Sequence, residues 1–110
     1  MLIDFNKIAE VTETGVRGGE GDMILRKSGD SLAKINFGRL QPGAYTGLHT
    51  HETNSEIIYI ISGEADFIYD DGAEKAVAGQ CHYCPKGHTH SMKNNGTEEL
   101  VFFAVLPEHP

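Results

Sequence analysis

Hydrophobic and polar residues alternate along much of the chain, and this pattern predicts β-strands. In residues 31–40 (SLAKINFGRL), Ala33, Ile35 and Phe37 fall on one face of an extended chain, and the polar residues between them fall on the other. Gln41-Pro42-Gly43 then has the composition of a turn. This stretch therefore predicts one strand that ends at a turn.

Further short segments of this kind follow, each bounded by glycine, proline, asparagine or aspartate. They are residues 47–51, 56–62, 64–70, 74–78, 80–85, 88–93 and 100–106. Ser62-Gly63 predicts a tight hairpin between the second and third of these segments. Short strands with a turn about every 8–12 residues are typical of an all-β sandwich or barrel.

Two of the predicted strands are apolar on both faces, namely Ile57 to Ile61 and residues 100–106. One face can fill the interior, so the other face needs a cover as well. We expect that a second copy of the chain covers it in a homodimer. The alternative cover is an N-terminal arm, residues 1–22, preceding a single barrel domain of residues 23–110.

The overall charge limits the classes of partner. The chain has 110 residues, which fits one compact domain, and a formal net charge of −7 without any basic run. This charge argues against nucleic acid and anionic membranes as partners. No apolar stretch approaches the roughly 20 residues that a membrane-spanning helix needs. The first residues also lack the basic and apolar regions of a secretion signal, so we expect a cytoplasmic protein.

The only cysteines, Cys81 and Cys84, form a single CxxC. No second CxxC completes a zinc ribbon. On a strand the two side chains point to opposite faces about 10 Å apart, which is too far for a disulfide. We expect buried free thiols, in keeping with a reducing compartment.

The segment LHTHETNSEIIYIISGE carries the residues with metal chemistry. His49 and His51 are two positions apart, so a strand turns both imidazoles to the same side. Glu56 follows a short link that can bring its carboxylate to the same point. A further histidine must come from another strand, and His90 is the natural candidate. Three imidazoles and one carboxylate suit one divalent transition metal ion (Fe, Mn, Ni, Zn, Co or Cu), with a position left open for water or substrate.

Two spaced motifs contain these residues, and in both the chain resembles the cupin superfamily. Gly43, five residues, His49-Thr50-His51, four residues, Glu56, six residues and Gly63 match the first cupin motif, G(X)5HXH(X)3-4E(X)6G. The second motif, G(X)5PXG(X)2H(X)3N, is met by Gly79, Pro85, Gly87, His90 and Asn94. The 15 residues between the motifs are similar to the spacing in small single-domain microbial cupins.

The resemblance implies an antiparallel β-barrel of the jelly-roll type, also called a double-stranded β-helix. It also implies a metal ion bound by His49, His51, Glu56 and His90. Asn94 is expected to hold its turn through side-chain hydrogen bonds.

Three residues are candidates for a catalytic role. Glu56 can change between ligand and base, and His88 has the same strand parity as His90 and could act as a general base. Tyr45 is a candidate for a hydrogen bond to substrate. His82, in contrast, is expected to fix its hairpin or to face solvent.

Cupin resemblance alone does not select a reaction, because the superfamily contains many activities. We favour a small metalloenzyme that acts on an oxygen-rich small molecule, such as an isomerase or lyase of a sugar acid or keto acid. One alternative is a non-haem metal dioxygenase. Another is a metal-dependent module that binds or senses a small molecule without turnover.

Overall fold

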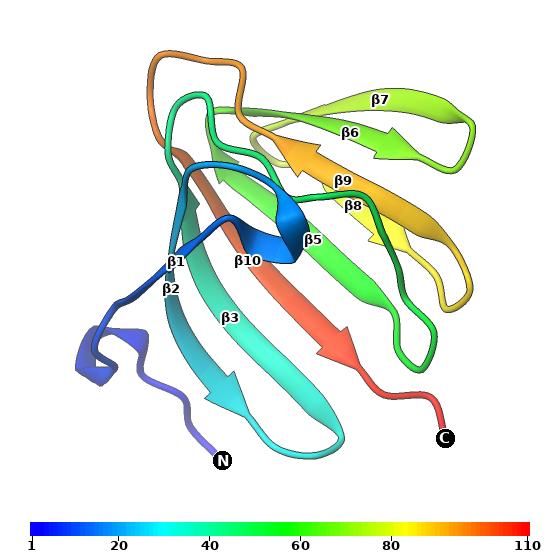
Figure 1. Ribbon diagram of the computed structural model, residues 1–110. Helices are drawn as coiled ribbons and strands as arrows, with labels where there is room; N and C mark the ends of the chain where they lie inside the picture. Colours follow the sequence, from blue (N-terminus) through cyan, green and yellow to red (C-terminus); the bar gives the residue numbers. More distant parts are fainter.

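Two antiparallel β-sheets face each other in the computed structural model, which describes residues 1–110 (Figure 1). The larger sheet contains, in spatial order, β1 (Val11–Thr14), β2 (Asp22–Gly29), β3 (Ala33–Leu40), β10 (Leu100–Pro107), β5 (Glu56–Ser62) and β8 (Cys81–Cys84). The smaller sheet contains β4 (His49–Thr50), β9 (Thr89–Lys93), β6 (Glu64–Tyr69) and β7 (Gly72–Val77). The only helical segments are two short 3-10 turns, η1 (Phe5–Lys7) and η2 (Val16–Gly18). The predicted all-β fold is confirmed.

The hydrophobic core lies between the sheets and is built by strand alternation. On β5, Ile58 and Ile60 point inward, and on β10, Phe102 and Ala104 do the same. Gly38 on β3 leaves room for the Phe102 ring, because a Cβ atom at this position would come within 2.4 Å of it. The inner faces therefore pack closely at the middle of the larger sheet.

The inner and outer faces of β3 are the reverse of those that its composition suggests. Asn36 and Leu40 are buried on the inner face, whereas Ile35 and Phe37 lie on the outer face. Phe37 stays partly buried because Phe5, the first residue of η1, packs its ring 5.9 Å from that of Phe37. The polar residue is inside because this part of the interior is a cavity and not a filled core.

The predicted hairpin at Ser62-Gly63 is wrong. β5 belongs to the larger sheet and β6 to the smaller one, so the chain crosses between the sheets at this point. Gly63 makes the corner with a φ of 87°, a backbone conformation that favours glycine. A corner and a hairpin have the same turn residues, and only the pairing of the flanking strands separates them.

The N-terminal residues contribute to the larger sheet. β1 pairs with β2, a strand that sequence patterning did not single out, and the Arg26 side chain donates to the main-chain oxygens of Phe5 (3.0 Å) and Ile8 (2.6 Å). The division into an arm of residues 1–22 and a barrel of residues 23–110 stays a prediction.

The cysteines form no disulfide, as expected. Cys84 is buried, but Cys81 is exposed, so the expectation of two buried thiols is wrong for Cys81. Strand β8 lies at the edge of the larger sheet, and its outward side chains have no layer above them.

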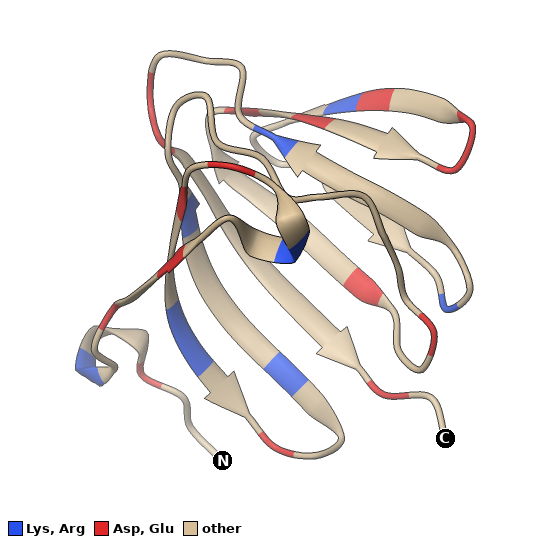
Figure 2. Cartoon of the chain, viewed as in Figure 1, with Lys and Arg blue, Asp and Glu red and all other residues tan.

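Charged side chains are scattered over strands and loops, as Figure 2 shows. No helix of the chain is long and apolar enough to cross a membrane.

Candidate metal centre

Three of the predicted ligands lie on strands that face one another. His49 on β4 and His90 on β9 are direct partners in the antiparallel pairing of the smaller sheet. Glu56 begins β5 in the larger sheet and lies on the face that Ile58 and Ile60 turn inward. The histidines and the carboxylate therefore approach from opposite sheets.

The fourth ligand, His51, follows β4 and is held by the turn between β8 and β9. Its main-chain nitrogen donates to the oxygen of His88 (3.1 Å), and its carbonyl accepts from the nitrogen of Gly87 (2.6 Å). The Pro-Lys-Gly turn of the second motif thus fixes a ligand of the first motif.

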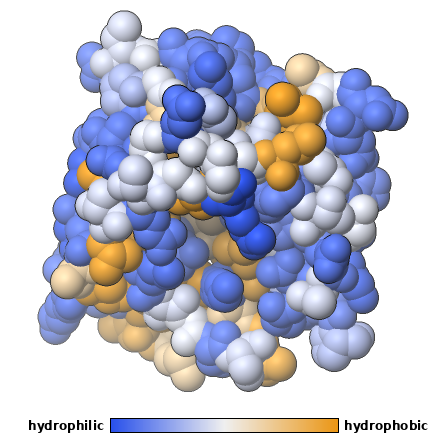
Figure 3. All heavy atoms as spheres, in the orientation of Figure 1, coloured by the Kyte–Doolittle hydropathy of each residue, from blue (hydrophilic) through white to orange (hydrophobic).

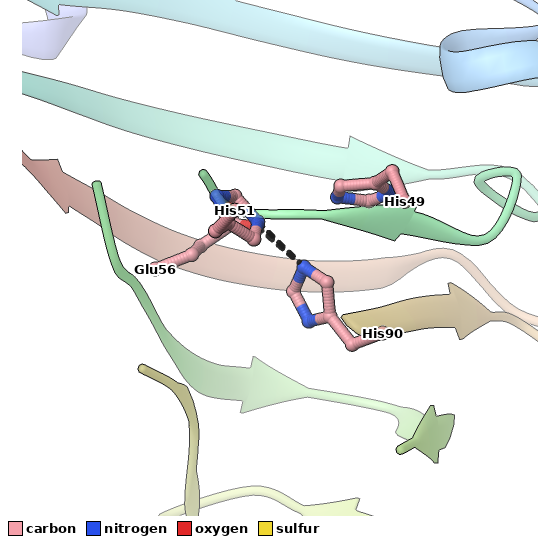
Figure 4. Close-up of side chains that lie close together, drawn as sticks. All are labelled: His49, His51, Glu56 and His90. Carbon is pink, nitrogen blue, oxygen red and sulfur yellow. Dashed lines mark hydrogen bonds and ion pairs between the residues drawn. The ribbon is translucent and has the colours of Figure 1, made fainter. Parts of the chain in front are cut away.

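The four side chains converge, as Figure 4 shows. One ligand atom from each lies within 4.8 Å of the others. The Nε2 atoms of His51 and His90 are 2.9 Å apart, and Glu56 Oε1 lies 3.3 Å from the first and 3.1 Å from the second. His51 and His90 are buried, and His49 and Glu56 are partly buried. The sequence prediction that these residues meet is confirmed.

Two of the rings are oriented by nearby oxygen atoms. His49 Nδ1 lies 2.7 Å from the main-chain oxygen of Gly47, and His51 Nδ1 lies 2.8 Å from Asn54 Oδ1. A carbonyl oxygen only accepts, so each Nδ1 carries the proton and donates. The lone pair of a neutral ring is then on Nε2, available to a metal ion.

The local charge state favours cation binding. Burial alone would raise the pKa of Glu56, but hydrogen bonds from His51 and His90 outweigh it and lower this pKa to about 2. The hydrogen bond to Glu56 raises the pKa of His51, and burial lowers the pKa of His49. The carboxylate therefore stays ionised near neutral pH and offers a negative charge to the centre.

The chemistry of these four donors fits a divalent transition metal ion. Lone pairs of nitrogen and oxygen that face one another need a positive charge between them, supplied by a proton or by a metal ion. Ligand atoms on opposite sides of such an ion lie about 4 Å apart, so small ring movements bring these four donors to bonding distance. Imidazole with carboxylate suits several first-row metals, and the donors do not choose among them.

A cavity of about 220 Å³ leads to the four ligands. Figure 3 shows a hollow in this face of the molecule, with hydrophobic atoms inside and mainly hydrophilic residues around it. Its apolar walls are formed by Met23, Leu25, Ile58, Met92, Phe102, Ala104 and Leu106. Such walls limit the water that reaches the centre and strengthen electrostatic interactions there.

The part of the cavity lining that reaches solvent is charged and mainly basic. It contains Glu13, Arg17, Lys27 and Lys34. Lys27 pairs with Glu13 at 2.8 Å, so Arg17 and Lys34 leave a local excess of positive charge in a protein of net negative charge.

A family model described as "Cupin domain" matches residues 36–106, a span that contains both motifs and all four ligands. The chain belongs to the cupin family. The two facing sheets and the converging ligands are thus features of a cupin jelly roll, and the predicted fold type is confirmed.

A curated protein and a crystal structure, both from Thermotoga maritima, resemble this cupin over nearly its whole length. An oxalate-binding protein is 33% identical over 113 residues, which cover 96% of this chain and 93% of that protein. The crystal structure of a predicted oxalate decarboxylase is 29% identical in sequence and has a TM-score of 0.91. The match covers 99% of this chain and 100% of that one.

A plant relative is matched over a smaller share of its length. Nectarin-1 of Nicotiana langsdorffii x Nicotiana sanderae is 34% identical over 77 residues, which cover 66% of this chain and 32% of that protein. The match with the oxalate-binding protein therefore extends over far more of both chains than the match with Nectarin-1.

The other two residues with a predicted catalytic role do not line the metal cavity of this cupin. His88 is bound to Asp70 (Nδ1 to Oδ2, 2.6 Å) and stacks on Tyr69. Tyr45 lies under the ammonium of Lys93, 5.5 Å from the ring centre, in a groove formed by β6, β7 and β9. Their catalytic roles stay predictions, as does that of Glu56.

His82 was expected to fix its hairpin or to face solvent, and the second of these alternatives is wrong. The residue is buried on β8, its Nε2 lies 3.0 Å from His90 Nδ1, and its ring stacks on Phe67 with centroids 3.8 Å apart. Burial lowers the pKa of His82. His82 and Cys84 are two positions apart on one strand, so both side chains turn to the same side. This spacing was the available signal, but the sequence did not show which side of the strand faces inward.

Asn36 is a residue that sequence patterning placed with Lys34 on the polar face of its strand. It is buried in the cavity wall, and its Oδ1 has no hydrogen-bond partner. A buried unpaired oxygen costs about 1–3 kcal/mol, so Asn36 is a destabilising element of the cavity wall.

Proposed function

We propose that this cupin binds a small carboxylic acid of the size of oxalate through a divalent metal ion held by His49, His51, Glu56 and His90. One observation carries the proposal. A single cavity of about 220 Å³ has converging metal donors at its inner end and a mainly basic lining toward solvent. The similarity to a protein named for oxalate binding supports the choice of acid.

A bound divalent ion supplies positive charge and an exchangeable coordination position for a carboxylate oxygen. The three imidazoles, whose Nδ1 atoms are fixed by hydrogen bonds, would hold the ion through Nε2. The carboxylate of Glu56 lowers the charge of the centre by one unit, which keeps the bound acid exchangeable. The apolar walls exclude water that would compete for the same position.

Arg17 and Lys34 attract the anion and hold its outer end. Arg17 lies on η2 with a φ of 55°, which is uncommon for a residue with a side chain and costs on the order of 1 kcal/mol. The turn is held against the metal-binding segment, because Gly47 donates from its nitrogen to the oxygen of Val16 at 2.9 Å. Retaining a guanidinium in this conformation beside the cavity supports a role in binding an anion.

Binding without turnover is the function we place first, and lysis of the bound acid is second. Apart from the ligands, the side chains of the cavity lining that can transfer a proton are Glu13, Lys27 and Lys34, and these lie toward solvent and not beside the metal donors. The similarity to a predicted oxalate decarboxylase favours the second candidate. In that case Glu56 is the group nearest the reacting carboxylate, and roles for His88 and Tyr45 would be indirect.

We also propose that the chain forms a homodimer through the outer face of the larger sheet. Ile57, Tyr59, Ile61 and Tyr83 lie there on adjacent strands and are 37–55% exposed. Phe5 covers only the neighbouring part of this face, over Phe37 and Phe103. A continuous apolar strip of this kind is a common basis for association between copies. The cytoplasmic location stays a prediction.

The test of the function begins with elemental analysis of protein purified without added metal, followed by calorimetric titration with oxalate. We expect binding of about one oxalate per chain in loaded protein, and none after chelation. Arg17→Gln and Lys34→Gln are each expected to weaken binding about tenfold, as loss of a charged contact does. Lys86→Gln, on the exposed turn, is the matched control. Oxalate affinity that is unchanged by chelation would contradict the proposal.

Turnover is measured on the same samples. Release of carbon dioxide without oxygen uptake would establish the lyase, and metal-dependent oxygen uptake would establish a dioxygenase. Saturable binding with neither signal would establish the binding module.

A further inference from the structure

A buried histidine outside the ligand set connects the metal centre to the edge of the molecule. His82 Nε2 lies 3.0 Å from Nδ1 of the ligand His90, and His82 Nδ1 lies 2.5 Å from Oε1 of Glu74. The His82 ring is held on one side by Phe67. The planes of the two histidine rings differ by 14°, which aligns the nitrogen of one with the lone pair of the other.

The proton positions along this row follow from the groups at its ends. The carboxylate of Glu74 accepts, so Nδ1 of His82 carries a proton and donates to it. A neutral His82 then has its lone pair on Nε2 and accepts from His90 Nδ1. This leaves the lone pair of His90 on Nε2, the atom that faces the other ligands.

The opposite arrangement conflicts with metal binding. If His82 donated from both nitrogens, His90 Nδ1 would have to accept, and the proton of a neutral His90 would be on Nε2. That proton would point at the position of the metal ion. Metal binding by His90 Nε2 is therefore possible only when His90 Nδ1 donates to His82 Nε2 and His82 Nδ1 donates to Glu74.

This anchor differs from those of the other two histidine ligands. His49 and His51 are held by uncharged oxygens two and three residues away in the chain. His90 is held through a second histidine by a carboxylate whose side chain is 51% exposed. The row also joins the two sheets, because Glu74 is on β7 at the end of one and His82 is on β8 at the end of the other.

We propose that His82 and Glu74 are positioning residues that fix the Nδ1–H form and the orientation of His90 for metal binding. This inference rests on the metal centre of the proposed function but not on its ligand. A hydrogen-bonded partner of this kind makes a histidine ligand more basic, and its loss typically weakens metal affinity by about 10–100-fold.

Zinc affinity, measured by competition with a chelator and without oxalate, tests the proposal. His82→Phe keeps a flat ring on Phe67 but removes the acceptor, and we expect zinc affinity to fall about 10–100-fold. Glu74→Gln keeps an acceptor oxygen and loses the charge, so we expect a smaller loss of about 3–10-fold. Glu64→Gln removes a carboxylate that only pairs with Lys75 at the surface, and it should leave zinc affinity unchanged.

Nitrogen NMR of the zinc-loaded protein gives a readout that a general loss of packing would not produce. We expect the native protein to show His90 with a protonated Nδ1 and zinc on Nε2, and a proton on His90 Nδ1 that exchanges slowly with water. In His82→Phe that proton should exchange quickly. If this variant does not fold, the native spectrum and Glu74→Gln still decide.

Native zinc affinity in both variants, or zinc on His90 Nδ1, would overturn the proposal. Failure of the native protein to bind zinc would overturn it together with the metal centre. Failure to bind oxalate, with zinc binding intact, would reject only the proposed ligand.

Discussion

The side-chain amide of Asn94 donates a hydrogen bond of 2.8 Å to the main-chain oxygen of Leu40, 54 residues earlier in the chain. The same nitrogen donates to the oxygen of Glu98 at 2.8 Å, and Oδ1 accepts from the nitrogen of Gly96 at 2.9 Å. Every polar atom of this buried side chain is therefore used. The last residue of the second motif joins its own turn to the end of β3, just before the first motif begins.

Replacement of Asn94 should destabilise the fold. Asn94→Ala removes three hydrogen bonds, one of them to the main-chain oxygen of the buried Leu40, so we expect the free energy of unfolding to fall by about 2–4 kcal/mol. Urea denaturation of metal-free protein measures the change. Asn95→Ala, which removes only an exposed contact to Asp66, should change it by less than about 0.5 kcal/mol. Equal effects in the two variants would contradict this account.

His51→Ala should abolish metal binding without unfolding the protein. The variant loses one of four donors and the hydrogen bond to Glu56, while the hydrophobic core between the sheets is unchanged. We expect metal content to fall from about one ion per chain to near zero, with an unchanged β-sheet circular dichroism spectrum. Full metal occupancy in this variant would show that His51 is not a ligand.

The proposed dimer can be disrupted from the outer face of the larger sheet. Tyr59→Glu adds a charge at an exposed position in the apolar strip, so light scattering at micromolar concentration should change from twice the chain mass of 12.0 kDa to that mass. Ile68→Glu, at a 50% exposed position on the outer face of the smaller sheet, is the matched control and should stay dimeric. A native protein that is already monomeric would reject the dimer.

The buried thiol of Cys84 gives a pH-dependent prediction. Burial raises the pKa of Cys84 to about 11, so the folded protein holds this proton more strongly than the unfolded chain, whose thiols titrate near pH 9. Stability from this group is present below about pH 9 and is lost as the pH rises through about 11. In Cys81→Ser, the remaining thiol should be unreactive to Ellman's reagent at pH 8 until urea is added. Rapid reaction of folded protein would contradict its burial.

Sequence patterning predicted the parts of the molecule that depend on local spacing. The two motifs identified the four candidate metal donors that the structure brings together, and the spacing of His49 and His51 alone turns both of them to one side. The continuous apolar runs of β5 and β10 likewise predicted strands with two apolar faces, as Ile58 inside and Tyr59 outside show for β5. These features need no knowledge of which strands are neighbours.

Features that depend on sheet membership could not be predicted in this way. Ser62-Gly63 has the composition of a hairpin but links two sheets, and Asn36 looks like a solvent-facing residue until β3 is seen to line a cavity. His82 was missed for the same reason. Its neighbours His90 and Glu74 come from strands whose closeness is set by the three-dimensional arrangement and not by spacing in the chain.

The position of β10 has a consequence for the synthesis of this protein. β10 lies between β3 and β5 in the larger sheet, yet it leaves the ribosome after all the other strands. Until then the facing edges of β3 and β5 have no partner, and unpaired apolar edges are where nascent β-proteins aggregate. The larger sheet therefore closes only once residues 100–107 have emerged, and until then the open edges of β3 and β5 can pair with other chains.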